Sequence, residues 1–222
     1  MWSVILKMTD KIPGKELIPA YRFHCQTFKI IADLWLCGPT SKGPEGEKFD
    51  GAFPYGFLDH VKDCFREYYP ENKNEVLHVC SGRVPESEGM RLDIDPKYHP
   101  DYLCNAENFI QQGGIRVASS QFNFVISDTP YNQAAASKYY NKKMINRSLV
   151  LRQMARVCII GGLIGVLDQI MPVSPPQCLQ VVARIGVTSV PNLDMRIFTV
   201  LKKVSAYVGK EKDEGLARID TF

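Results

Sequence analysis

From residue 75 onward the chain is built of short apolar runs that end at polar residues, glycine or proline. Runs of this length and composition predict buried β-strands. A helical pattern from about Ile145 to Val157 separates two of them, which favours parallel strands joined by a helix. The runs are EVLHVC (75–80), MRLDID (90–95), DYLC (101–104), FNFVIS (122–127) and GGLIGVLDQI (161–170).

The last apolar runs differ from the others in lying close together. LQVVARIGVTSV (179–190) and MRIFTVLKKV (195–204) are separated by a short turn at Pro191-Asn192. This spacing predicts an antiparallel hairpin. The chain is therefore expected to form an α/β fold, with a mixed sheet that ends in this hairpin and helices on both faces.

The N-terminal part is expected to lie outside this sheet. FKIIADLWL (28–36) has apolar residues at helical spacing and predicts a short helix, and the Gly- and Pro-rich stretch at 38–52 predicts a loop. FLDHVKDCFREYY (57–69) is amphipathic and predicts a longer helix that stops before Pro70. The expected organisation is an extension of helix and loop, a main domain and a charged tail: 1–50, 51–208 and 209–222.

Composition narrows the class of protein. The formal net charge is +3 and 45% of the residues are hydrophobic, which is usual for a globular protein and permits a nucleic-acid partner without requiring one. The seven cysteines include no Cys-x-x-Cys pair and the four histidines are scattered, so we expect reduced thiols and no metal site. No apolar stretch is long enough to cross a bilayer, and we expect a cytoplasmic protein with no membrane partner.

Polar residues follow four of the predicted strands. In α/β sheets ligands bind beyond the carboxyl ends of the strands, so these residues are expected to share one cleft. Taken singly, each has an ordinary alternative: a plain turn, a solvated acid, a helix cap, or a strand exit with a core tyrosine. In chain order the groups are Cys80-Ser81-Gly82, Asp93 with Asp95, Asn105-Ala106, and Asp128-Thr129-Pro130-Tyr131.

The last of these groups has a particular chemistry. An amino group on an aromatic ring is a poor nucleophile, because its lone pair is delocalised, and hydrogen-bond acceptors on its hydrogens would make the nitrogen more tetrahedral. Asp128 can supply one acceptor and the Thr129 carbonyl a second. Pro130 would stiffen the turn, and Tyr131 offers a face on which a base can stack.

On these residues the chain resembles the class I S-adenosylmethionine-dependent methyltransferases. It is most similar to the amino-methyltransferases of DNA, which methylate adenine N6 or cytosine N4, and to small phage and mobile-element methylases. Their signature is (Asp/Asn/Ser)-Pro-Pro-(Tyr/Phe/Trp), which residues 128–131 match at three of four positions. The likeness covers roughly residues 50–203, including Ala155-Arg156-Val157 and Gly161-Gly162, and implies a Rossmann-like fold with a seven-stranded mixed sheet.

The resemblance also implies roles for the other strand ends. Cys80, Ser81 and Gly82 would face the methionine part of S-adenosylmethionine. Asp93 would bind its ribose, and Asn105 and Ala106 would bind its adenine. The segment FPYGFL (53–58), with Phe53 first, is similar to the segment that closes over the methionine end of the cofactor. Residues 128–131 would hold the target base.

Three departures from the family pattern bear on activity. Arg83-Val84-Pro85 stands where many relatives have a second glycine. Thr129 replaces the first proline of the signature, which keeps the carbonyl but loosens the turn. Asn105 stands where many relatives have an acid.

A nucleic-acid-binding stretch is predicted after the tetrapeptide, where basic and aromatic residues alternate. The only material for a separate recognition domain is the N-terminal extension, so sequence specificity is low or a partner protein supplies it. The expected reaction is methylation of adenine N6 in DNA. The alternatives are an RNA or protein-glutamine methyltransferase, or a degenerate methyltransferase fold serving as a nucleic-acid-binding or assembly subunit. The predicted binding residues are Lys138, Tyr139, Tyr140, Lys142, Lys143 and Arg147.

Overall fold

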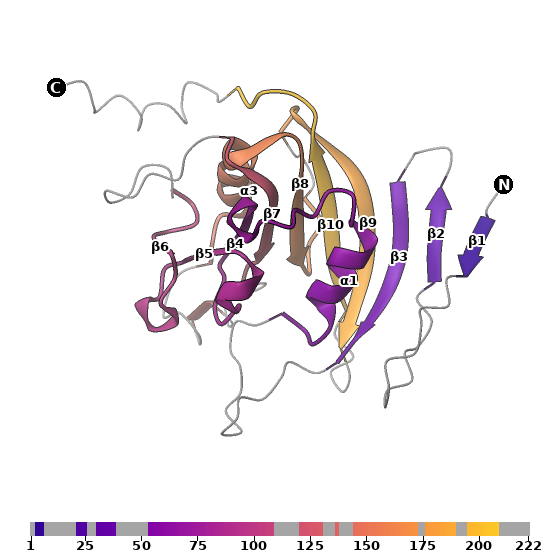
Figure 1. Ribbon diagram of the computed structural model, residues 1–222, viewed down its shortest axis with the longest axis horizontal. Coiled ribbons are helices and arrows are strands. Elements are labelled where there is room, and N and C mark those ends of the chain that lie inside the picture. The colour runs from indigo at the N-terminus through magenta and orange to yellow at the C-terminus, as the bar shows by residue number, and fades with distance from the viewer. Residues whose placement is uncertain are drawn as a thin grey trace.

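The computed structural model describes residues 3–6, 21–25, 30–38, 53–108, 120–130, 136–137, 144–172, 176–189 and 195–208. Within them the chain forms one sheet of ten strands in the order β1-β2-β3-β9-β10-β8-β7-β4-β5-β6 (Figure 1). The strands are β1 (Ser3–Leu6), β2 (Tyr21–Cys25), β3 (Ile30–Cys37), β4 (Val76–Val79), β5 (Met90–Asp93), β6 (Tyr102–Leu103), β7 (Phe122–Asp128), β8 (Cys158–Asp168), β9 (Leu179–Ser189) and β10 (Met195–Lys203).

The directions of the strands confirm the predicted fold class. β4 pairs in parallel with β5 and β7, β5 with β6, and β7 with β8. β10 lies antiparallel to both β8 and β9, so the predicted C-terminal hairpin is present. The sheet is thus Rossmann-like and mixed, and its carboxyl edge collects the ends of β4, β5, β6, β7 and β8.

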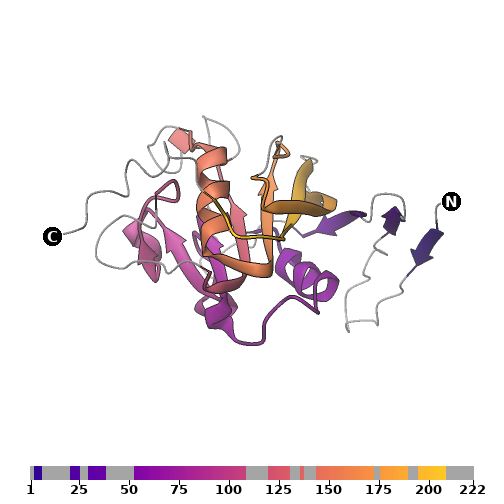
Figure 2. The ribbon, with the colours of Figure 1, turned by 90° about the horizontal axis from the view of Figure 1, so that it is seen from above.

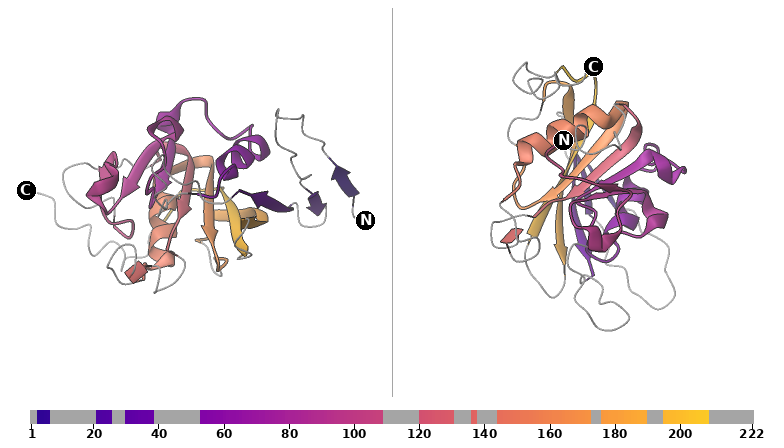
Figure 3. Two further views of the ribbon diagram at one scale, coloured as in Figure 1. Left: turned by 90° about the horizontal axis from the view of Figure 1, so that it is seen from below. Right: turned by 90° about the vertical axis from the view of Figure 1, so that its left-hand side faces the viewer.

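Helices cover both faces of the sheet, as predicted. α1 (Phe57–Cys64) packs through Phe57 and Val61 into a core that also contains Phe124, Ile126 and Phe198. α3 (Arg147–Val157) packs on the other face. The edge-on view in Figure 3 shows the two helices on opposite sides, and Figure 2 shows the same layers from above.

Both helices begin close to the predicted positions. α3 begins after Asn146, whose side chain accepts hydrogen bonds from the N–H groups of Ser148 and Leu149. α1 is shorter than predicted, since the helix ends at Cys64 and residues 65–68 form turns.

The predicted helix over residues 28–36 is wrong, because Ile30–Cys37 form strand β3. Asp33, Trp35 and Cys37 are buried while Leu34 and Leu36 are exposed, which is the period of two of a strand with one covered face. The same apolar residues also fit a helical period over a short window, and parallel pairing with β9 decides between the two. The N-terminal segment therefore contributes strands to the sheet.

The connection between β8 and β9 is unusually short. These strands are parallel to each other, with β10 between them, yet only the ten residues 169–178 join them. A parallel crossover normally takes a dozen or more residues and contains a helix. The described part of this connection, residues 169–172 and 176–178, contains no helix, so the sheet face beside α3 lacks the cover that a second helix would give.

Candidate functional site

The carboxyl edge of the sheet holds a cavity of about 450 Å³ between the ends of β4, β5, β6 and β7. We call it the edge cavity. It brings together five residues predicted from the sequence to share a site: Cys80, Asp93, Asn105, Ala106 and Pro130. The other lining residues are Leu92, Ile94, Glu107, Ala136, Met144 and Ile145.

The turn after β4 has a strained backbone at the cavity. Cys80 and Gly82 have φ angles of 56° and 50°, in the left-handed region that favours glycine. Such conformations cluster at ligand-binding sites when the surrounding contacts hold them. The holding contacts are hydrogen bonds from Ser81 N to Leu92 O, at 3.0 Å, and from Gly82 N to the Asp93 carboxylate.

Cys80 lines the cavity, whereas Ser81 and Gly82 lie in the turn behind it. The Ser81 hydroxyl is buried and has no hydrogen-bond partner. Burial, followed by the charges of Asp93 and Asp128, raises the pKa of the Cys80 thiol well above its ordinary value. The thiol is therefore not a nucleophile at neutral pH.

Asp93 is the carboxylate of the edge cavity. It ends β5, and its two oxygens accept hydrogen bonds from Gly82 N at 2.8 Å and Asp95 N at 3.0 Å. Burial raises the pKa of Asp93, and the N–H groups of Asp95 and Gly82 oppose that rise. Each carboxylate oxygen can accept a further hydrogen bond, so the group is fixed in position and can still bind a hydroxyl.

The segment after β6 closes another side of the cavity. The side-chain oxygen of Asn105 accepts a hydrogen bond from Glu107 N at 2.9 Å and so forms a local turn. The helix cap that the sequence left open for Asn105 would involve residues from 109 onward, which lie outside the described part of the chain. Ala106 is buried against the cavity, and Ile94 on the β5 side is partly exposed. Together Ile94 and Ala106 give the cavity two apolar surfaces.

Phe53 does not line the edge cavity. It stacks on Phe57, with ring centroids 5.0 Å apart, and meets His78 edge-on. Burial lowers the pKa of His78 to about 4, so this imidazole is neutral at physiological pH. The structure thus places Phe53 in the core beneath α1.

The tetrapeptide after β7 divides its side chains between the two faces of the sheet. Asp128 shares the α1 side with Phe124 and Ile126, and its oxygens accept hydrogen bonds from Arg196 Nη1 at 3.0 and 3.1 Å. Thr129 points to the α3 side and Pro130 lines the edge cavity. Tyr131 lies outside the described residues.

The Asp128–Arg196 pair is largely buried, with 11% and 15% of the two side chains exposed. Burial raises the pKa of Asp128, and the Arg196 guanidinium opposes that rise. Sequence reasoning missed Arg196, since nothing in the β10 run marks it as a partner of a residue 68 positions earlier.

Asp168, at the end of β8, is a second buried carboxylate that the sequence reasoning missed. It accepts hydrogen bonds from Thr129 Oγ1 at 3.2 Å and from Arg147 Nε and Nη2. It also accepts from the N–H groups of Gln169 and Ile170. The sequence offered one signal for Asp168, which was its position. It ends the fifth parallel strand, just as the four predicted groups lie at the ends of the other four parallel strands.

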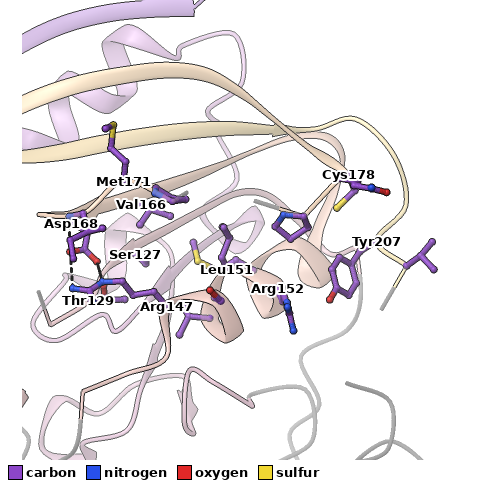
Figure 4. A pocket seen from close by; sticks show the side chains of 18 of the residues that line it. Ser127, Thr129, Arg147, Leu151, Arg152, Val166, Asp168, Met171, Cys178 and Tyr207 are labelled. Atoms are coloured by element: carbon purple, nitrogen blue, oxygen red, sulfur yellow. Dashed lines mark hydrogen bonds and ion pairs between the residues drawn. The ribbon is translucent and has the colours of Figure 1, made fainter. Parts of the chain in front are cut away.

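A larger cavity of about 920 Å³ lies on the α3 side of the same strand ends, and Figure 4 shows it from close by. We call it the α3 cavity. Thr129 lines this cavity and Pro130 lines the edge cavity, so the two are separated by adjacent residues of one turn. Its walls come from α3, the ends of β7 and β8, the connection 170–178, and residues 205–208.

The predicted nucleic-acid-binding stretch is described only at its end. Lys138, Tyr139, Tyr140, Lys142 and Lys143 lie outside the described residues. Arg147 is the first residue of α3, where it pairs with Asp168 and lines the α3 cavity.

Among the described residues no group of three or more His, Cys, Asp or Glu side chains is placed to hold a metal ion. No described helix combines the length and apolar character needed to span a membrane. Six cysteines whose side chains the structure describes are free thiols: Cys37, Cys64, Cys80, Cys104, Cys158 and Cys178.

No protein-family model matches the sequence, and no curated protein resembles it significantly. Among solved structures, TrmN from Thermus thermophilus matches with a TM-score of 0.43 and 13% identity, over 65% of this chain. The match covers 48% of TrmN, so this chain spans about half of that protein's length.

Two further structures resemble the chain at similar levels. The 1,6-didemethyltoxoflavin-N1-methyltransferase of Burkholderia thailandensis, solved with S-adenosylhomocysteine, has a TM-score of 0.39 and 10% identity over 59% of this chain and 71% of its own. An rRNA methylase from Streptococcus thermophilus has a TM-score of 0.39 and 7% identity over 67% of this chain and 96% of its own. At these identities no residue role carries over from either protein.

Proposed function

We propose that the protein is an S-adenosylmethionine-dependent methyltransferase acting on the exocyclic amino group of a nucleobase, with adenine N6 in DNA as the preferred target. One observation carries the proposal. Each of the four predicted groups that end neighbouring strands contributes a residue to a single cavity of about 450 Å³: Cys80, Asp93, Asn105 with Ala106, and Pro130. Cavities that bind cofactors and other small ligands have volumes of this order.

The donor half of the site is the edge cavity, and its residues fit the cofactor. The fixed carboxylate of Asp93 suits the two hydroxyls of a ribose. Ile94 and Ala106 offer apolar surfaces on either side of a flat adenine, and the backbone beside Asn105 offers hydrogen-bonding groups to its edge. When bound, S-adenosylmethionine supplies an electrophilic methyl group on a sulfonium.

The acceptor half is the turn after β7. The Thr129 carbonyl and the remaining lone pairs of Asp128 would accept the hydrogens of the target amino group. These two acceptors would make the amino nitrogen more nucleophilic and orient its lone pair toward the edge cavity, and the proton that the nitrogen releases on methylation would pass to solvent. Arg196 keeps Asp128 ionised and oriented, and Tyr131 would stack on the base. Positioning and fixed dipoles supply most of the rate.

The test is methyl transfer from labelled S-adenosylmethionine to a panel of acceptors: single- and double-stranded DNA, RNA, and a glutamine-containing protein factor. We expect label in DNA at adenine N6, lost by at least about a hundredfold in Tyr131→Ala. Label confined to RNA or protein would replace the DNA assignment, and transfer unchanged in Tyr131→Ala would refute the role of the tetrapeptide.

A second candidate function is a methyltransferase fold that binds nucleic acid without methylating it. The observation that favours it is the Asp128–Arg196 pair, because both carboxylate oxygens are already hydrogen-bonded. Under this function the protein would bind oligonucleotides, and no acceptor in the panel would be labelled.

A further inference from the structure

The floor of the α3 cavity carries a polar group that no described residue satisfies. Ser127 has no exposed surface, its hydroxyl has no hydrogen-bond partner, and it lines this cavity. A buried hydroxyl without a partner costs free energy, so its retention calls for an explanation. A ligand atom inside the cavity would supply the missing hydrogen bond.

The walls around that floor suit a flat ring. Leu151 from α3 and Val166 from β8 are apolar and lie beside Ser127 in the cavity lining (Figure 4), and Met154 from α3 also lines the cavity. A hydroxyl can both donate and accept a hydrogen bond, which matches the ring nitrogens and amino groups of a nucleobase. The cavity is open on this face because the β8–β9 connection is too short to hold a covering helix.

Two arginines in the lining suit an anion. Among the described residues that line the cavity, the charged side chains are Arg147, Arg152 and Asp168, and Asp168 pairs with Arg147. A phosphate entering here would lie beside guanidinium groups.

The position of the cavity relates it to the donor site. Thr129 and Pro130 are adjacent in the chain and face the α3 cavity and the edge cavity respectively. Asp168 fixes Thr129 through its hydroxyl, so the turn between the two cavities is held from the α3 side.

We propose that the α3 cavity binds one unstacked nucleotide that flanks the target base in the acceptor strand, with the base of this nucleotide against Ser127 and its phosphate toward Arg147 and Arg152. This inference rests on the proposed function, which has the target base at the turn after β7, and extends it by assigning the neighbouring nucleotide to the α3 side of the sheet. Ser127 is then a specificity residue that pairs only when the base is bound.

The experiment compares Ser127→Ala with Thr199→Val. Thr199 is a second buried hydroxyl without a partner, it flanks Val166 from the opposite strand in the same row as Ser127, and it does not line the cavity. Binding of adenosine 5′-monophosphate, oligodeoxyadenylate and oligoriboadenylate is measured by calorimetry with S-adenosylhomocysteine present.

We expect Ser127→Ala to weaken binding of all adenine probes by about tenfold, the value of one buried hydrogen bond. Thr199→Val should bind within twofold of the wild-type protein. Leu151→Trp, which places a bulky ring in the part of the cavity beside Ser127, should abolish binding of the mononucleotide. Arg152→Gln should weaken binding of the two oligonucleotides and reduce the salt dependence of their binding. The ratio of the two oligonucleotide affinities identifies the acceptor as DNA or RNA.

Nucleotide binding unchanged in both Ser127→Ala and Leu151→Trp would overturn the inference, as would a wild-type protein that binds no probe. S-adenosylhomocysteine is titrated separately. If it fails to bind while the nucleotide affinities follow the expected order, the proposed function fails and the nucleotide site stands. If it binds and the nucleotides do not, the proposed donor site stands and the α3 site is refuted.

Discussion

Asp168→Ala tests whether the carboxyl edge is organised by one buried carboxylate. The substitution removes the ion pair with Arg147 and the acceptors for Thr129 Oγ1 and for the N–H groups of Gln169 and Ile170. Breaking a buried charge pair on one side costs about 3–5 kcal/mol. Arg147 is 31% exposed and can recover part of its hydration, so we expect a loss near the lower limit, about 3 kcal/mol.

The assay is urea denaturation at neutral pH, with the free energy of unfolding obtained by linear extrapolation. Asp63→Ala is the matched control, since Asp63 also pairs with an arginine but both side chains are largely exposed, and its cost should stay within about 0.5 kcal/mol. A double-mutant cycle with Arg147→Met should give a coupling energy of at least about 1 kcal/mol. A loss below 1 kcal/mol for Asp168→Ala, or additive effects in the cycle, would refute the reasoning.

Three other outcomes are expected. Ser127→Ala and Thr199→Val should each raise the free energy of unfolding by up to about 1 kcal/mol in urea denaturation, because each removes a buried hydroxyl without a partner; destabilisation by Ser127→Ala would show that its hydroxyl is paired. The rate of methyl transfer should fall on the acid side of its pH profile with an apparent pKa above the ordinary aspartate value, because burial raises the pKa of Asp128. Arg196→Met should move this acid limb to higher pH, because Arg196 lowers the pKa of Asp128. If the limb does not move, Asp128 is not the group whose titration limits the reaction. Asp93→Ala should weaken S-adenosylmethionine binding at least about tenfold by calorimetry, through loss of hydrogen bonds to the ribose, and unchanged affinity would remove Asp93 from the donor site.

The strands of the main domain could be predicted because each apolar run ends in a residue that cannot continue it. Asp93 and the turn at Cys80–Gly82 fall at such ends, and parallel strands bring their ends to one edge. Local pattern and one rule of sheet geometry were therefore enough to assemble the edge cavity.

β3 could not be predicted, because a short apolar segment fits both a helical and a strand period. The choice was made by pairing with β9, about 150 residues later in the chain, which no local window contains. The arginine partners of Asp128 and Asp168 could not be predicted for the same reason. Arg196 is 68 positions from Asp128, and Arg147 is 21 positions from Asp168.

The α3 cavity was also beyond sequence reasoning. The cavity depends on the sheet surface that the short connection 169–178 leaves uncovered. The apolar pattern of β8 and β9 would be the same whether or not a helix covered that surface. Ser127 reads as an ordinary strand residue until its hydroxyl is seen to lack a partner.

The most direct test of the account is a calorimetric titration of the protein with S-adenosylmethionine, comparing Ile94→Asp with Leu103→Asp. Ile94 is partly exposed and lines the edge cavity, while Leu103 is exposed on β6 and does not line it. We predict one-site binding that is weakened at least about tenfold in Ile94→Asp and unchanged in Leu103→Asp. No binding by the wild-type protein, or equal affinity in both variants, would contradict the claim that four strand ends build a donor site at this edge.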